Sequence, residues 1–229
     1  MSGIPPFDLD VVDRLLTTTK AVRRRLDLDR PVPRALIVEC LRLASYAPNA
    51  SNSQDWRWIV VDDPDQRRRV GEHYRKEVEW RCREMLAAKE SAGDEAGARI
   101  TRSVLSLAQR MGDVPVLVIP CYDLDAAADR YRRLLSSESA PTSMTPAMFA
   151  SILPAVWSFQ LALRSRGLGS TLTTAHQEDQ PGMARILGIP DSWYQVALIP
   201  CAYTTGGDFR PSHRDPVADF VNGNGLGSA

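Results

Sequence analysis

The segment formed by residues 145–166 constrains the fold more than any other part of the sequence. Thr145 and Pro146 make a good N-cap and first-turn pair, and the helix that they begin is predicted to run to Arg166. Large apolar side chains occupy most of its faces: Phe149, Ile152, Leu153, Val156, Trp157 and Leu163. Other elements must cover a helix of this kind. The sequence therefore predicts that this helix lies at the centre of the protein.

Short apolar and β-branched runs predict the strands of a sheet. Residues 115–120 (PVLVIP) are wholly apolar, which is typical of a strand buried on both faces. Further strands are expected at residues 56–61, 170–174 and 194–203. Helical periodicity predicts further helices over residues 9–19, 33–47, 64–90, part of 91–112 and 178–188. The irregular alternation predicts a mixed α+β fold rather than a βαβ barrel.

The charge balance disfavours two classes of partner. The chain has 28 Lys and Arg residues and 28 Asp and Glu residues, so its formal net charge is zero. Non-specific binding to nucleic acid or to anionic membranes rests on a basic excess, so we expect neither. We also expect no membrane span, because no apolar run approaches the roughly 18–20 residues required. The N-terminus lacks the basic and apolar regions of a secretory signal.

The cysteines and histidines show no metal-binding pattern. Cys40, Cys82, Cys121 and Cys201 are widely spaced and form no C-x-x-C pair, and the three histidines are scattered. A disulfide framework and a zinc cluster are therefore disfavoured, and a reducing cytoplasm is the expected compartment. Phosphate-loop, zinc-protease and nucleophile-elbow motifs do not occur in the sequence.

Four widely spaced segments together carry a family resemblance. They are residues 20–25 (KAVRRR) before P-V-P, 47–56 (APNASNSQDW), 167–174 (GLGSTLTT), and 197–203 (ALIPCAY) followed by R-D-P-V at 214–217. In this order they resemble the FMN-dependent nitroreductase family, over residues 11–221. The resemblance implies a single domain with a mixed, mostly antiparallel sheet wrapped by helices, followed by a tail at 222–229. It also implies an intertwined homodimer with one FMN at each of two interfaces.

The resemblance implies a cage for the FMN phosphate, which guanidinium groups hold well. The residues implied are Lys20, Arg23, Arg24, Arg25 and Arg214. Thr19 stands where the family's R-R-S-x-R pattern begins, and two extra residues precede P-V-P. Which of the three consecutive arginines contact the phosphate therefore stays open. The alternative interpretation is that this run is a solvated surface, as arginine is common in the chain.

The loop of the second segment resembles the family's P-S-x-x-N-x-Q-P-W. The resemblance implies that Ser51, Asn52 and Gln54 reach the flavin from the second subunit. Asp55 replaces the usual proline and Asn49 the usual serine, and neither change removes the Asn or the Gln. The alternative is that these polar residues are turn formers that cap the preceding helix.

Two further regions complete the implied site. Backbone groups of Thr173, Thr174 and Ala175 are expected at the N5 and O4 edge of the flavin, the alternative being a plain exit from a strand. Residues 136–149 are expected to form the roof of the substrate pocket, with Met144, Met148 and Phe149 as an adaptable apolar cover. For Met148 and Phe149, core packing is an equal alternative.

The activity implied is a ping-pong reaction in which NAD(P)H reduces FMN and a nitroaromatic or quinone is then reduced. The flavin performs the chemistry, so no catalytic side chain is required. Within the same fold, a deazaflavin-linked, dehalogenating or flavin-cleaving enzyme is the alternative. A flavin-binding protein without turnover is the alternative from another class.

Overall fold

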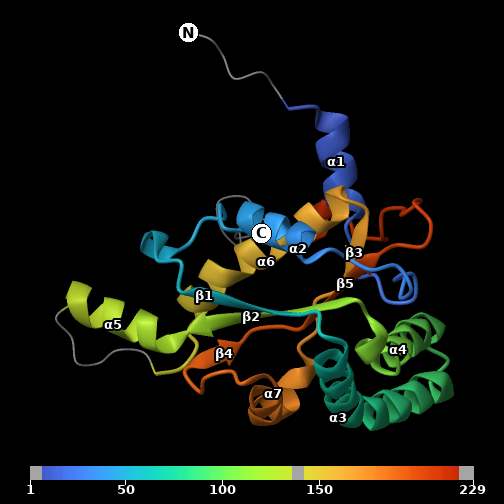
Figure 1. The fold of residues 1–229 in the computed structure, drawn as a ribbon. Helices are drawn as coiled ribbons and strands as arrows, with labels where there is room; N and C mark the ends of the chain where they lie inside the picture. The colour runs from blue at the N-terminus through green and yellow to red at the C-terminus, as the bar shows by residue number, and fades with distance from the viewer. Residues whose placement is uncertain (1–6, 136–141, 222–229) are drawn as a thin grey trace, which may run out of the picture.

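One antiparallel sheet forms the middle of the protein (Figure 1). The computed structural model describes residues 7–135 and 142–221. The strand order is β1-β2-β5-β3, and β4 also pairs with β2. The strands are β1 (Trp56–Val61), β2 (Val116–Asp123), β3 (Leu168–Ser170), β4 (Trp193–Gln195) and β5 (Ile199–Tyr203). With helices on both faces, the fold is α+β with a mostly antiparallel sheet, as predicted.

Strand β2 separates two hydrophobic cores. Every residue of β2 is buried, which confirms the prediction for residues 115–120. Val116 and Val118 join the core beneath α2 (Arg34–Ala44) and α6 (Pro146–Ser165). Leu117 and Ile119 join the core formed with α3 (Pro64–Ser91), α4 (Glu95–Ala108) and α7 (Gln180–Leu187). The alternation of strand side chains thus places one helical layer on each face of the sheet.

Helix α6 is central, as predicted from the apolar side chains on most of its faces. Ile152, Val156 and Phe159 are buried against the sheet and α2, whereas Leu153 and Trp157 remain 40% and 42% exposed. By length and composition α6 qualifies as a membrane span, with an 18-residue window of mean hydropathy 1.4. The expectation that no apolar stretch reaches that length is therefore wrong. Half of this window is buried inside the molecule, as in a core helix.

The region after α6 differs most from the predicted elements. The expected strand at 170–174 is β3, which ends at Ser170, and Thr173 forms only an isolated bridge with Leu198. The expected helix at 178–188 is a 3-10 turn (Ala175–Asp179) followed by α7. Helix α5 (Leu124–Leu135), which follows β2 without a break, was not predicted.

A bulge divides the strand predicted at 194–203. Cys121 pairs with Gln195, and Val118 pairs with Ile199. The two pairs are three residues apart on β2 but four residues apart on the segment that contains β4 and β5. One extra residue between β4 and β5 interrupts the ladder, as in a β-bulge. An apolar sequence pattern does not reveal such a shift of register.

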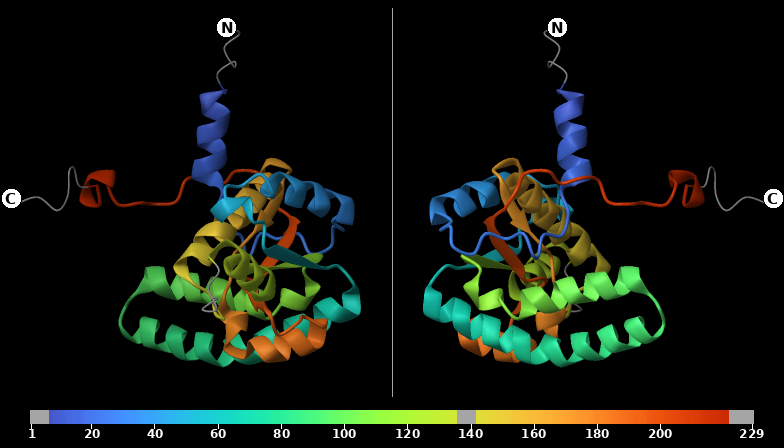
Figure 2. Two further views of the ribbon diagram at one scale, coloured as in Figure 1. Left: turned by 90° about the vertical axis from the view of Figure 1, so that its left-hand side faces the viewer. Right: turned by 90° about the vertical axis from the view of Figure 1, so that its right-hand side faces the viewer.

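Both ends of the described chain extend from the body (Figure 2). Helix α1 (Leu9–Thr18) projects on one side, and the segment after Gly207 runs outward to a 3-10 turn at Val217–Asp219. Leu9, Val217 and Phe220 are exposed on these extensions. The predicted tail at 222–229 and part of the predicted roof, 136–141, lie outside the described residues.

Candidate functional site

A basic pocket lies where the segment after α1 meets the segment after β5. It has a volume of about 420 Å³, and its basic lining residues are Lys20, Arg23, Arg24, Arg25 and Arg210. Hydrogen bonds join the segments: Lys20 Nζ donates to the Arg210 carbonyl oxygen (2.9 Å), Arg25 Nε donates to that of Thr205 (2.8 Å), and the Thr205 amide donates to that of Arg25 (2.9 Å). The structure therefore brings together four of the predicted phosphate-cage residues.

The positive charge of this pocket has no carboxylate partner among the described residues. Asp208 lines the pocket but forms no ion pair there, whereas Arg166, directly after α6, pairs with Glu39 on α2 at 2.6 Å. None of the pocket's basic residues forms an ion pair within the described ranges: Lys20, Arg23, Arg24, Arg25 and Arg210. Arg23 is half-buried, and burial lowers its pKa. An unbalanced cluster of this kind suits a multiply charged anion.

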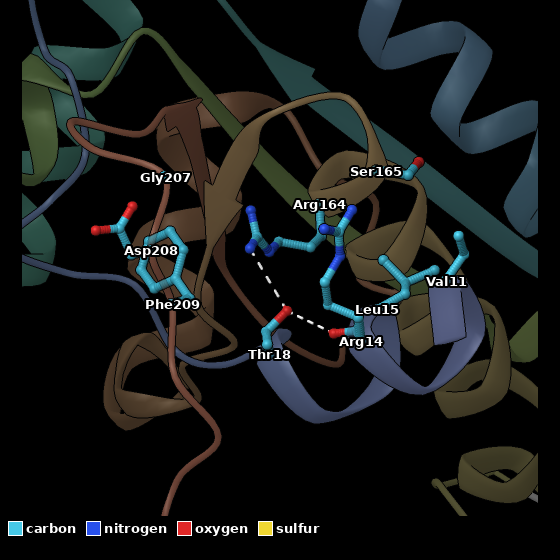
Figure 3. Close-up of a pocket in the computed structure, with 9 residues that line it drawn as sticks. All are labelled: Val11, Arg14, Leu15, Thr18, Arg164, Ser165, Gly207, Asp208 and Phe209. Atoms are coloured by element: carbon cyan, nitrogen blue, oxygen red, sulfur yellow. Dashed lines mark hydrogen bonds between the residues drawn. The ribbon is translucent and has the colours of Figure 1, made fainter. Parts of the chain in front are cut away.

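A second pocket continues the basic surface on the other side of Phe209 (Figure 3). It has a volume of about 510 Å³, and Arg14 and Arg164 line it. The Phe209 ring lies 4.3 Å from the Arg25 guanidinium and 4.7 Å from that of Arg164. Burial, Arg14 and Arg25 lower the pKa of Arg164. Phe209 thus separates two crowded guanidinium groups.

Arg214 lies apart from the basic pocket. Its side chain is exposed, and its guanidinium donates to the adjacent His213 carbonyl oxygen (2.8 Å). Arg210, four residues earlier, is the arginine that the segment after β5 contributes to the pocket. The sequence alone did not show which of Arg210 and Arg214 lines the pocket, because both lie in a segment without regular secondary structure.

The loop between α2 and β1 has an unusual backbone. Ser51, Asn52 and Gln54 have φ angles of +54°, +50° and +53°, in the left-handed region that L-residues rarely adopt. Asn49 makes the turn contacts, since its amide nitrogen donates to Ala47 O (3.2 Å) and its Oδ1 accepts from the Gln54 amide (3.0 Å). The side chains of Ser51, Asn52 and Gln54 are exposed. Clusters of backbone strain are typical of ligand-binding segments.

A buried ion pair fixes the end of this loop. Asp55 accepts hydrogen bonds from Tyr122 Oη on β2 (3.1 Å) and Arg130 Nε on α5 (3.2 Å). Burial and Asp55 raise the pKa of Tyr122 to about 12, so the phenol keeps its proton. An acidic residue directly before an apolar strand needs a partner when it is buried, and this pattern is the signal by which the pair could have been found.

Within one chain, the loop between α2 and β1, called the strained loop below, and the basic pocket lie toward opposite ends of α6. The Ala50 amide donates to Ser151 Oγ near the start of α6 (3.2 Å), and Gln160 Nε2 donates to Ser170 Oγ of β3 (3.1 Å). Ser151 and Gln160 are about 14 Å apart along the helix axis. Val22 of the basic segment bonds to the Ser170 carbonyl oxygen (2.9 Å). A single chain therefore does not bring the second predicted segment to the first.

The third predicted segment lies at the same end as the basic pocket. Thr173 exchanges backbone hydrogen bonds with Leu198 (3.0 and 2.8 Å), and its Oγ1 is 2.8 Å from Tyr74 Oη on α3. The charge of Arg23 acts on the same phenol. Thr174 is exposed and Ala175 is half-buried at the start of the 3-10 turn.

The predicted substrate roof is divided between surface and core. Met148 is 1% exposed and belongs to the core, in agreement with the core-packing alternative. Met144 and Phe149 are partly buried. The Phe149 ring meets Tyr194 of β4 edge-on, with ring centroids 6.1 Å apart.

The comparison with protein families decides the classification. The family model described as "Nitroreductase family" matches residues 17–203, which include the basic segment, the strained loop and Thr173–Ala175. The chain belongs to the nitroreductase family. A comparison with curated proteins found no match.

Solved structures of other proteins share the fold at low sequence identity. An iodotyrosine deiodinase bound to FMN and 3-iodo-L-tyrosine has a TM-score of 0.67 at 18% identity, covering 92% of this chain and 99% of that one. A nitroreductase-like protein from Streptococcus mutans has a TM-score of 0.66 at 19% identity, covering 93% and 98%. An FMN- and NADPH-dependent nitroreductase from Sphigopyxis sp. strain HMH has a TM-score of 0.65 at 18% identity, covering 93% and 99%.

The residues of this nitroreductase-family chain fit FMN. The phosphate of FMN is a dianion, and the basic pocket offers uncompensated donors for it. In residues 7–135 and 142–221, no group of three His, Cys, Asp or Glu side chains could hold a metal ion.

Proposed function

We propose that the protein is an FMN-dependent oxidoreductase that takes hydride from NAD(P)H and reduces nitroaromatic or quinone-like acceptors. The observation that carries this proposal is the uncompensated basic pocket, which lies beside the Thr173–Ala175 segment in a nitroreductase-family fold. The basic pocket suits the phosphate dianion of FMN, and the backbone amides after Thr173 suit the edge of its ring.

Each segment has a distinct role in this proposal. Lys20, Arg24 and Arg210 bind the phosphate, and half-buried Arg23 supplies positive charge beside the pyrimidine ring of the flavin. The backbone amides of Thr174 and Ala175 hydrogen-bond to the opposite edge of that ring, because both backbone groups of Thr173 are already bonded to Leu198. FMN supplies the hydride chemistry, and the chain supplies binding, orientation and electrostatics.

A second copy of the chain completes the site. The strained loop contacts α6 at Ser151, whereas the strand beside the basic segment contacts it at Gln160, about 14 Å further along the helix axis. We therefore propose that a partner's loop contributes Ser51, Asn52 and Gln54. Exposed Leu153 and Trp157 on α6 supply an apolar surface for that partner. Light scattering during size exclusion is expected to give a dimer, and a monomer that retains FMN would contradict this assignment.

Anaerobic spectroscopy of the purified protein tests the activity. FMN absorbs near ~450 nm, and we expect NADPH or NADH to remove this absorbance and a nitroaromatic or quinone to restore it. A yellow protein that NAD(P)H does not bleach would favour flavin binding without turnover. A colourless protein that takes up no FMN would contradict the proposal.

Dehalogenation is the second candidate, because a solved structure with the same fold is described as an iodotyrosine deiodinase. The discriminating assay adds a halotyrosine, in place of the nitroaromatic, to the protein reduced anaerobically. Release of halide, without reoxidation by nitroaromatics, would favour the second candidate. Reduction of the bound FMN by a reduced deazaflavin in place of NAD(P)H, or loss of the flavin itself, would identify the remaining alternatives.

A further inference from the structure

Tyr74 is a buried phenol with one polar partner among the described residues. It lies on α3, is 0% exposed and packs beside Val70 and Val78. Its hydroxyl lies 2.8 Å from Thr173 Oγ1, an ordinary distance for a bond between two hydroxyl groups. Burial raises the pKa of Tyr74, so the phenol keeps its proton and remains a donor at neutral pH.

Thr173 Oγ1 also has a second, weaker neighbour. The Ala175 amide nitrogen lies 3.4 Å away, well beyond the usual 2.9–3.0 Å of an N–H···O bond. The Tyr74 hydroxyl therefore holds the threonine oxygen, while the Ala175 amide is bound only loosely. A loosely held amide on a half-buried turn is free to donate to a ligand.

We propose that Tyr74 is a positioning residue that keeps the Ala175 amide available to a ligand by holding the Thr173 hydroxyl away from it. The proposal rests on the proposed function in one respect, namely that the ligand is FMN. The charge of Arg23 also acts on the Tyr74 phenol.

Loss of the Tyr74 hydroxyl changes the balance at Thr173. In Tyr74→Phe the threonine oxygen loses its stronger partner and closes on the Ala175 amide, as serine and threonine do in local side-chain turns. In Thr173→Val no oxygen remains to capture the amide. The two substitutions are therefore not additive, and Thr173→Val suppresses the effect of Tyr74→Phe.

Amide hydrogen exchange in the protein without flavin tests this directly. Exchange at Ala175, followed by NMR, is expected to be about fivefold slower in Tyr74→Phe than in the wild type, the factor for one ordinary hydrogen bond. The double variant should exchange at least as fast as the wild type.

Tyr203→Phe is the matched control, because Tyr203 is partly buried and its hydroxyl makes no hydrogen bond among the described residues. Equal rates in Tyr74→Phe and the wild type would overturn the proposal.

Thermal unfolding shows whether Tyr74→Phe is folded. If it is not, a second variant keeps the test decisive. Thr173→Val alone should then give faster exchange at Ala175 than the wild type, and a slower rate would overturn the proposal.

FMN binding supplies the second readout. The Kd for FMN is expected to rise about fivefold in Tyr74→Phe, and the reduction potential of bound FMN to become more negative, because a donor near the ring stabilises charge gained on reduction. Both values should return to those of the wild type in the double variant. If the wild type binds no FMN, the proposed function fails while the exchange experiment still decides the role of Tyr74. If FMN binds equally to all variants with one potential, the role of Tyr74 fails and the proposed function stands.

Discussion

At the scale of single residues, the environment of an arginine decides what it does. Arg130 and Arg166 are neutralised by Asp55 and Glu39. The described side chains of the basic pocket have no such partners. The same residue type thus stabilises the fold in one place and remains available for an anion in another.

Substitution of the pocket arginines should weaken FMN binding. Arg23→Ala and Arg210→Ala are each expected to raise the Kd for FMN about tenfold or more, because each removes a charge-assisted hydrogen bond to the phosphate or ring. Arg69→Ala, an exposed arginine on α3, is the control, and Arg214→Ala should resemble it. Fluorescence titration measures all four. If Arg214→Ala binds FMN weakly and Arg210→Ala binds it normally, Arg214 is the phosphate ligand, as the sequence predicted.

His176 makes the stability of the protein depend on pH. It is 0% exposed, neither ring nitrogen has a partner among the described residues, and burial followed by the charge of His73 lowers its pKa from 6.5 to about 4. The unfolded chain therefore binds the proton more readily, and stability is lost as pH falls from about 6.5 towards 4. The loss reaches about 3 kcal/mol.

Urea unfolding at pH 7 and pH 4.5 measures this loss. In His176→Leu the fall in the free energy of unfolding over this range should be smaller than in the wild type. Equal losses in the two proteins would show that His176 is not responsible.

At the scale of elements, α5 and the strained loop are held by a buried ion pair. The side chains of Asp55 and Arg130 are 7% and 16% exposed. Asp55 also links the loop to β2 through Tyr122 (3.1 Å) and through its carbonyl oxygen, which accepts from the Asp123 amide (2.8 Å). The position of the loop is therefore coupled to β2 and α5.

Removal of the buried cation should destabilise the fold. Arg130→Met leaves the Asp55 carboxylate buried without its cation, at a cost of about 3–5 kcal/mol. Arg132→Met on the same helix is the matched control, because Arg132 and Asp129 form an exposed pair worth less than about 1 kcal/mol. Chemical denaturation compares the two. Similar losses in both variants would contradict a special role for the buried pair.

At the scale of the whole molecule, the strained loop and the basic pocket lie toward opposite ends of α6. Leu153 and Trp157 give α6 an exposed apolar surface, which a second copy covers in the proposed dimer. Under our proposal, the two parts of the FMN site come from different subunits.

Subunit mixing tests this arrangement. Arg23→Ala and Asn52→Ala homodimers should each bind FMN weakly. A mixed dimer should regain one intact site, formed by the basic pocket of the Asn52→Ala chain and the loop of the Arg23→Ala chain. Co-expression with two affinity tags, followed by FMN titration, measures the recovery. No recovery in the mixed dimer would place the loop and the pocket in separate sites.

The sequence by itself determined the elements that local periodicity controls. The buried strand at 115–120, the central helix from Pro146 and the arginine run between helices follow from which residues are apolar and at what spacing. The family resemblance, which rests on four short segments in order, was also available from the sequence, and the family match confirms it.

Tertiary structure alone decided the contacts between distant residues. Lys20 meets Arg210 across 190 positions, Tyr74 meets Thr173 across 99, and Asp55 meets Arg130 across 75. Such contacts depend on the path of the whole chain, including an unpredicted helix and a one-residue bulge that shifts the register between β4 and β5. Local spacing carries no record of that path, because a side chain's neighbours in space are set by the packing of every element between them.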